Sequence, residues 1–223
     1  MDDEKGQMMD AVIAEYVAGG MALPAQVLVE SHLELVPENK AWAGELEALA
    51  GAELDSMEPV ALGDMSSMLD AIMDSPASEP VTSVKNGVES ASPSASDDIL
   101  PKPLRDFIGY TADTIPWRTK IPGVKVFNIE DPEGCSVSLL KIRPGMAMPD
   151  HSHEGRELTL VLKGAFSDVS GRYQRGDVSV AEEGEDHKPV ADYGEDCICF
   201  IVADAPMRFT NRFTRIVNSI LPS

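Results

Sequence analysis

The chain has 223 residues, enough for one large domain or two small ones, and a formal net charge of −20. Residues 1–100 carry a net charge of −17 and residues 101–223 carry −3, so the charge favours two parts of different character. An acidic half repels nucleic acid and membrane surfaces and suits a basic protein partner, so we expect neither nucleic-acid binding nor membrane binding.

Several features of the sequence predict a cytoplasmic protein. No run of apolar residues approaches the roughly 20 that a membrane span needs. The start of the chain, MDDEKGQMMD, is acidic and lacks the apolar stretch of a secretory leader. Three cysteines, an odd number, give no disulfide framework and are typical of reduced thiols in the cytosol.

Residues 1–75 favour a small bundle of short helices, which we take as the first domain. The helix signals are the Gly19-Gly20 stop, Pro24 in a first turn and the break at Pro37. The predicted helices span residues 10–18, 24–35, 40–54 and 64–73. Because each helix is short and amphipathic, the helices need each other or a partner to bury their apolar faces.

The apolar spacing assigns a shared face to each of the two later helices. In the third helix the side chains expected to point inward are Trp42, Leu46, Leu49 and Leu54. In the fourth, methionine-rich helix, one face carries Met65, Met68, Leu69 and Ile72. Methionine makes an adaptable apolar surface, which suits a partner interface or an ordinary core equally well.

Residues 76–103 differ in composition from the segments on both sides. They are rich in serine, proline, alanine and acidic residues and show no periodicity. This composition predicts a flexible, extended linker that tethers two domains.

Residues 104–223 change to short apolar runs separated by turn signals such as Pro122-Gly123 and Pro144-Gly145. The predicted strands span residues 124–129, 135–142, 158–162, 177–181 and 197–202. Many short strands of this kind indicate an all-β barrel or sandwich. The expected fold class is therefore α+β by domain, with a helical bundle, a linker and a C-terminal β-barrel.

Three of the four histidines fall in one pattern with a glutamate and bracketing glycines. The predicted metal ligands are His151, His153, Glu157 and His187. On a strand, His151 and His153 would face the same side because they are two residues apart. Three imidazoles and one carboxylate suit Zn, Fe, Mn, Ni or Cu, and ligand type alone does not choose among them. The alternative, unrelated surface and core histidines, leaves the joint occurrence of four ligands unexplained.

The two glycine-bounded pieces of this pattern resemble the two motifs of the cupin superfamily, which implies a cupin barrel for residues 104–223. Two positions depart from the cupin pattern without touching a ligand: Glu182 stands where many cupins have proline, and Ala191 where many have asparagine. Longer stretches resemble ChrR-type anti-sigma factors, among them YVAGG (16–20), SHLELVPENKAWAGELEAL (31–49) and ELTLVLKGAFSD (157–168).

The resemblance to this family implies a helical domain, residues 1–75, that grips an extracytoplasmic-function sigma factor. It also implies a cupin domain with one divalent metal, zinc ahead of iron, manganese or nickel. In the family this second domain is needed for release of the sigma factor under singlet-oxygen or peroxide stress.

One part of the family pattern is missing. Members of the family hold a second zinc with H-x3-C-x2-C and an earlier histidine, whereas here His32 is followed by Val36 and Asn39. Because one ligand of four remains, we predict no zinc in the N-terminal domain. His32 is then expected to be a surface or packing residue.

Two functions stay open at this point. The first is a regulatory anti-sigma factor, and the second is a cupin metalloenzyme of dioxygenase or isomerase type acting on a small organic substrate. The two-part architecture and the acidic first half favour the regulator over the enzyme. A homodimer through the cupin domain also stays open, as does the role of Cys197 and Cys199, which are either a redox-responsive pair or two core residues.

Overall fold

The computed structural model of the chain describes residues 2–60, 63–75, 98–132, 134–149, 151–152, 154–205 and 208–209. Side chains are described within these ranges from residue 5 to residue 205. Most of the predicted linker, residues 76–97, lies outside the described residues.

The first half of the chain is helical, as the sequence patterns predict. Its helices are α1 (Asp2–Val17), α2 (Leu23–Leu35), α3 (Pro37–Ser56) and α4 (Met65–Met73). α1 starts at Asp2 rather than at Asp10, because no proline interrupts these residues and a helix tolerates the single glycine, Gly6. A fifth helix, α5 (Lys102–Ile108), is not predicted by the sequence patterns and ends at Gly109, whose φ of 71° favours glycine.

The second half of the chain is an antiparallel β-structure. Its main sheet has the order β1-β2-β3-β10-β5-β8, from β1 (Arg118–Ile121), β2 (Val124–Ile129), β3 (Ser136–Ile142), β10 (Cys197–Ala203), β5 (Glu157–Lys163) and β8 (Val178–Ala181). A three-stranded sheet contains β7 (Gly171–Gln174), β6 (Ala165–Asp168) and β9 (Val190–Ala191), and β4 (His151–Ser152) pairs with β11 (Arg208–Phe209). The five predicted strands are β2, β3, β5, β8 and β10, which confirms the expected fold class.

The central strands of the main sheet, β5 and β10, are buried on both faces. In β10, Phe200 joins an apolar cluster shared with the helices, whereas Cys199 joins a second cluster inside the barrel. The same alternation places Val161 of β5 inside and directs three leucines of that strand to the helices, namely Leu158, Leu160 and Leu162. A strand between two apolar layers needs an apolar side chain at every position, which explains the unbroken run CICFIVA in β10.

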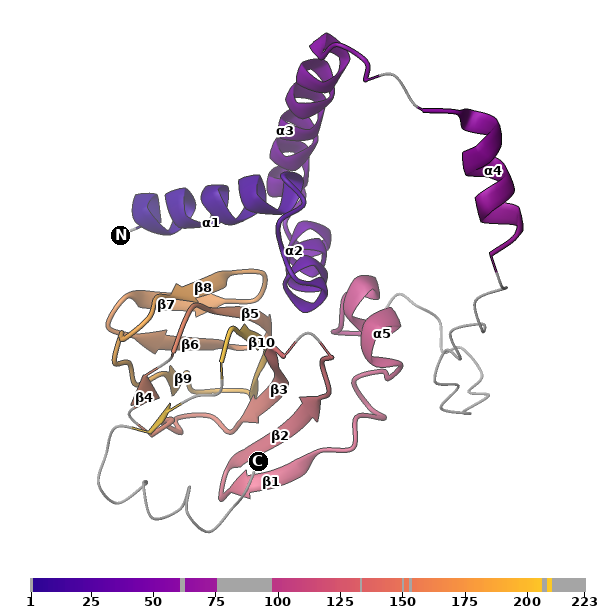
Figure 1. The fold of residues 1–223 in the computed structure, drawn as a ribbon. Coiled ribbons are helices and arrows are strands. Elements are labelled where there is room, and N and C mark those ends of the chain that lie inside the picture. Colours follow the sequence, from indigo (N-terminus) through magenta and orange to yellow (C-terminus); the bar gives the residue numbers. More distant parts are fainter. Residues whose placement is uncertain are drawn as a thin grey trace.

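α1 and α2 cover the outer face of the main sheet, and α5 lies beside α2 (Figure 1). Their contribution to the shared cluster includes Ile13 and Leu28, both with no exposed surface. Burying an apolar side chain of this size stabilises the fold by about 1.5–3 kcal/mol relative to leaving it exposed. The helical half and the barrel therefore share one core across the face of the sheet.

The predicted inward face of α3 is wrong for its second half. Leu49 and Leu54 are 68% and 69% exposed, and every residue from Glu47 to Ser56 is exposed. Ala43 is buried, Leu46 packs against the core and Trp42 is 39% exposed. The physical reason is the direction of α3, which extends away from the barrel after its first turns, so that its later apolar side chains meet no other part of the described chain (Figure 1).

Candidate metal centre

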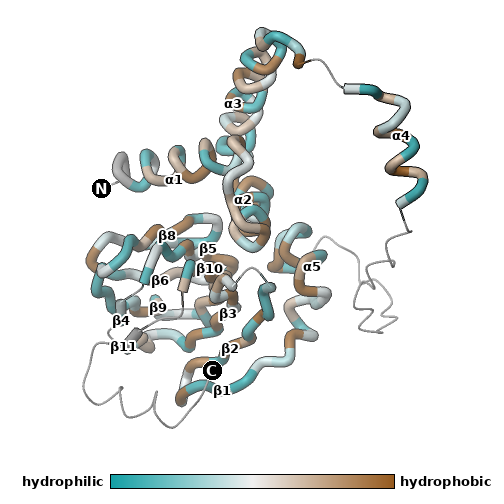
Figure 2. The backbone as a smooth tube through the Cα atoms, in the orientation of Figure 1, coloured by the Kyte–Doolittle hydropathy of each residue, from teal (hydrophilic) through white to brown (hydrophobic). Residues whose placement is uncertain are grey.

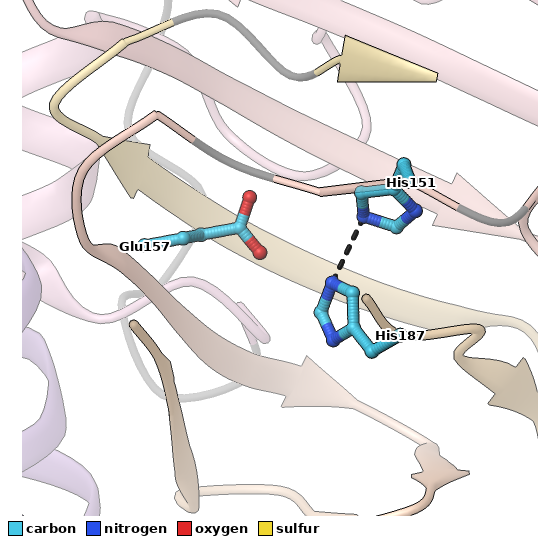
Figure 3. Close-up of side chains that lie close together, drawn as sticks. All are labelled: His151, Glu157 and His187. Carbon is cyan, nitrogen blue, oxygen red and sulfur yellow. Dashed lines mark hydrogen bonds between the residues drawn. The ribbon is translucent and has the colours of Figure 1, made fainter. Parts of the chain in front are cut away.

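His151 lies in β4 and His187 lies in the loop between β8 and β9, and an isolated β-bridge joins the two residues. The backbone of each residue bonds the other, with His187 N to His151 O at 3.1 Å and His151 N to His187 O at 3.4 Å. This pairing brings the two side chains together, and their Nε2 atoms lie 2.9 Å apart (Figure 3). The two rings therefore present the same kind of nitrogen to one point.

The other ring nitrogen of each histidine is held by an acceptor. His151 Nδ1 lies 2.8 Å from the carbonyl oxygen of Pro149, which can only accept a hydrogen bond, so Nδ1 carries the proton. His187 Nδ1 lies 3.5 Å from Oδ2 of Asp168, whose side chain is almost fully buried. Because an acceptor faces Nδ1 in both rings, Nε2 is the nitrogen that each histidine would offer to a metal, an arrangement common in metal sites.

Asp168 is placed by the turn between β6 and β7. Its Oδ1 accepts hydrogen bonds from the backbone N–H groups of Ser170 and Gly171, at 2.9 and 3.2 Å. Burial alone would raise the pKa of Asp168, but the hydrogen bonds from His187 and from these two N–H groups outweigh it and hold the pKa below its usual value. Asp168 is therefore an anion beside His187, a residue that motif spacing alone does not reveal.

Glu157 begins β5 and points into the barrel (Figure 3). It is 4% exposed, and burial raises the pKa of its carboxyl group to about 7, against the lowering effects of His187 and of the hydrogen bond from Thr159. One ligand atom each from His151, Glu157 and His187 lies within 4.8 Å of the others. A buried carboxylate without a compensating charge is unfavourable, so this trio fits a metal ion, which would supply that charge.

The fourth predicted ligand, His153, lies outside the described residues. Of the predicted set, the structure brings together the other three, His151, Glu157 and His187. In the described part of the chain, these three side chains form the group that lies close enough together to hold a metal ion.

The space between these side chains is small and mostly apolar. Its volume is about 30 Å³, enough for an ion or for very few water molecules. The apolar part of the lining includes Leu140, Ile142, Met148, Phe166 and Ile201. Such a lining excludes bulk water and strengthens the interaction of a bound cation with its ligands.

Cys199 lines the same cavity, and its Sγ lies 3.6 Å from Sγ of Cys197. Both thiols are buried, and the hydrogen bond between them, together with burial, raises the pKa of Cys199 well above its usual value. A protonated thiol is a poor nucleophile. These features favour the interpretation of the pair as core residues.

The positions that resemble a lost zinc site now connect the helical half to the barrel. His32 is 3% exposed; its Nδ1–H donates to the carbonyl oxygen of Gly176 at 2.7 Å, and its Nε2 accepts from Asn39 Nδ2 at 2.7 Å. Val36 packs beside Gly176, where its Cγ2 would lie 3.1 Å from an added Cβ. His32 is thus a packing residue with both ring nitrogens engaged, which supports the prediction that it holds no metal.

No helix in the described part of the chain is both long and apolar enough to cross a membrane.

Comparisons with known proteins place both halves of the chain in one family. A family model described as the ChrR Cupin-like domain matches residues 106–206. The anti-sigma-E factor ChrR of Cereibacter sphaeroides is 37% identical over 210 residues, which cover 93% of each chain. The crystal structure of Rhodobacter sphaeroides SigE in complex with the anti-sigma ChrR contains a chain that matches with a TM-score of 0.69 and 34% identity, covering 87% of this chain and 96% of that one. The chain therefore belongs to the family of ChrR-type anti-sigma factors.

Proposed function

We propose that the chain is an anti-sigma factor that binds an extracytoplasmic-function sigma factor through residues 1–75 and responds to oxidative stress through a metal-bound cupin domain. The observation that carries this proposal is the extent of the likeness to ChrR, which includes the helical half as well as the barrel. Because a sigma factor acts with RNA polymerase, we also propose a cytoplasmic location.

An uncovered apolar stripe on α4 supports a protein partner. Every residue of α4 is exposed, and four of its apolar side chains follow the spacing of one helix face, namely Met65, Met68, Leu69 and Ile72. These four residues are called the α4 stripe below. Figure 2 shows the hydrophobic positions along α4, a helix that stands apart from the rest of the molecule. Exposed apolar surface of this kind marks an interaction site, and methionine adapts to the shape of a partner.

The charge around the α4 stripe supports a basic partner. Residues 37–74 contain nine acidic side chains and one lysine. Sigma factors carry basic surfaces where they touch DNA, so an acidic helical segment is drawn to these surfaces and competes with DNA for them. Apolar contact and charge therefore favour the same class of partner.

For the metal we propose zinc, held by His151, Glu157, His187 and the predicted fourth ligand His153. The converging Nε2 atoms and the buried carboxylate support this set. Zinc accepts nitrogen and oxygen ligands in a four-coordinate site. When bound, the ion would supply a positive charge that links two strand ends of the barrel.

The size of the cavity favours a regulator over a metalloenzyme. Pockets that bind small organic molecules usually have volumes of about 300–1,000 Å³. The space beside His151 and His187 has a volume of about 30 Å³. A dioxygenase or isomerase substrate therefore has no room at the metal unless the barrel opens.

Binding to a sigma factor tests the proposal directly. The full chain is titrated with each extracytoplasmic-function sigma factor of its own organism, and we expect one tight complex. Leu69→Glu places a charge in the α4 stripe and should weaken this complex at least about tenfold, as expected for an interface anchor. Val169→Glu, at an 84% exposed position of the barrel, is the matched control and should leave affinity unchanged. No complex with any of these sigma factors would contradict the proposal.

A further inference from the structure

The strand β5 separates the candidate metal centre from the helical half. Its Glu157 and Thr159 line the cavity, and the leucines between and after them pack against the helices. Because alternate side chains of a strand point to opposite faces, one strand contacts the metal ligands on one side and α2 on the other. A displacement of β5 would therefore change both the position of Glu157 in the metal centre and the packing of the strand against α2.

Arg156 connects this strand to α1. It directly precedes Glu157, and its guanidinium donates two hydrogen bonds to the carboxylate of Glu15, at 2.6 and 3.0 Å. The two residues are 141 positions apart in sequence, so the pair joins the barrel to the helical half. A two-bond pair of arginine and carboxylate fixes orientation as well as distance.

The backbone around Arg156 is fixed on both sides by Asp204, which directly follows β10. Arg156 N donates to Oδ2 of Asp204 at 2.9 Å, and Asp204 N donates to Arg156 O at 3.0 Å. Gly155 has a φ of 89°, and a Cβ added there would lie 2.7 Å from Cβ of Asp204. This tight packing leaves Arg156 little freedom to move independently of Glu157.

The other side of the ion pair has room to rearrange. A cavity of about 140 Å³ lies between α1, α2 and the barrel, and its lining includes Glu15, Arg156 and Asp204. Neither side chain of the pair is fully buried, with 28% of Arg156 and 39% of Glu15 exposed. The junction can therefore loosen without opening the apolar cluster beside it.

We propose that Arg156 and Glu15 couple the metal centre to the helical half, so that metal binding at Glu157 and docking of α1 on the barrel stabilise each other. This inference rests on the proposed function, for which it supplies the regulation: loss of the metal frees the strand end at Glu157, weakens the Arg156–Glu15 pair and loosens α1. Coupling of this kind is reciprocal, so a change in docking must alter metal affinity by the same factor.

Because docking of α1 and metal affinity affect each other, a substitution in α1, far from the metal, tests the proposal. Glu15→Ala in the full chain removes the pair from the α1 side and should lower zinc affinity by about 1.4- to fivefold, the range expected for a partly exposed ion pair. Zinc affinity is measured by competition with a chelating indicator. Asp10→Ala is the matched control, because Asp10 is an exposed carboxylate of the same helix, and it should bind zinc as the wild type does.

A double-mutant cycle then assigns the effect to the pair. Arg156→Ala should also lower zinc affinity, and adding Glu15→Ala to it should cause no further loss. Hydrogen exchange supplies a second readout: zinc should slow exchange of the α1 and α2 amides in the wild type, and less so in Glu15→Ala. Equal zinc affinities for Glu15→Ala and the wild type would overturn the coupling.

The sigma-factor titration on the same preparations keeps the two proposals distinguishable. A chain that binds no sigma factor but shows the linkage between Glu15 and zinc would overturn the function and support the coupling. A chain that binds its sigma factor but shows no linkage would overturn the coupling alone.

Discussion

Each side chain at the metal centre depends on a partner that is not itself a ligand. Asp168 holds the ring of His187 through Oδ2, while its Oδ1 is used by the turn at Ser170 and Gly171. Such outer partners fix the tautomer and the orientation of a histidine ligand. One oxygen of Asp168 therefore orients His187 and the other stabilises the turn, so a substitution can remove one function and keep the other.

Asp168→Asn should weaken zinc binding about 10- to 100-fold, as is typical when the partner of a histidine ligand is lost. Asparagine keeps Oδ1 for the turn but places an N–H donor opposite Nδ1 of His187, which disfavours the tautomer that binds metal. Competition with a chelating indicator measures the change. Asp113→Asn, at an exposed position, serves as the control, and an unchanged affinity in Asp168→Asn would contradict this role.

His32 predicts a dependence of stability on pH. Burial lowers the pKa of His32, against the raising effects of the bond to Gly176 and of Asp177. Because the unfolded chain binds this proton at a higher pH than the folded chain, stability is complete above the unfolded pKa of about 6.5 and is lost as the pH falls below it.

The loss due to His32 is at most about 1.4 kcal/mol per pH unit, the limit for one proton. Urea unfolding of zinc-free protein at pH 7.5 and 5.5 measures the free energy of unfolding of the wild type and of His32→Gln, whose glutamine side chain does not titrate. We expect the wild type to lose more stability than the variant over this interval. Equal losses in both proteins would show that His32 does not contribute.

At the scale of elements, the end of α2 meets the turn between β7 and β8 at Gly176. This glycine has a φ of 94°, and an added Cβ would lie 3.1 Å from Cγ2 of Val36. A side chain there causes two separate problems, a left-handed backbone and a close contact with α2. The glycine in this turn therefore allows the end of the helix to pack closely against it.

Gly176→Ala should destabilise the protein by more than the roughly 1–2 kcal/mol expected from backbone strain alone. Gly194→Ala is the matched control, because its φ of 115° imposes strain while an added Cβ meets nothing within 4 Å. Combining Gly176→Ala with Val36→Ala should recover part of the extra loss. Chemical unfolding measures all four proteins, and equal losses for the two single glycine variants would argue against the contact.

At the scale of the whole molecule, α1 and α2 of the helical half cover the outer face of the main sheet. The cluster that contains Ile13 and Leu28 also contains Leu160 and Phe200 of the main sheet. Without α1 and α2, this face of the sheet would be exposed to water. The domain boundaries near residues 75 and 103 stay predictions, and the shared core gives a way to test them.

A chain that starts at residue 98 should expose the outer face of the sheet and associate through it, because large exposed apolar patches promote association. We expect oligomers on size-exclusion chromatography and strong binding of the dye ANS, both reduced when residues 1–60 are added in trans. A monomeric truncated chain with weak dye binding would show that the barrel is a self-sufficient domain.

The sequence predicts where the helices and strands of this fold lie better than it predicts which other elements they pack against. Alternation and unbroken apolar runs locate β2, β5 and β10, because these signals are local. The same kind of pattern predicts an inward face for Leu49 and Leu54, but periodicity does not tell whether an apolar face is covered by the chain itself or by a partner.

The candidate site shows the same division. His151, Glu157 and His187 are found from motif spacing, whereas the contributions of Asp168 and Arg156 depend on residues that only the folded chain brings near. Two-residue strands such as β4 and β9 are too short to carry a periodic signal. The sequence alone therefore does not predict which residues, distant along the chain, support the metal ligands.

The burial of β10 on both faces has a consequence for synthesis on the ribosome. All seven residues of this strand are buried, and a run such as CICFIVA without charge is prone to aggregate while it is exposed. Chain order places α1 and α2 ahead of β10, so the helices that cover its outer side leave the ribosome first. The nascent chain thus carries the cover for its most vulnerable strand before that strand is made.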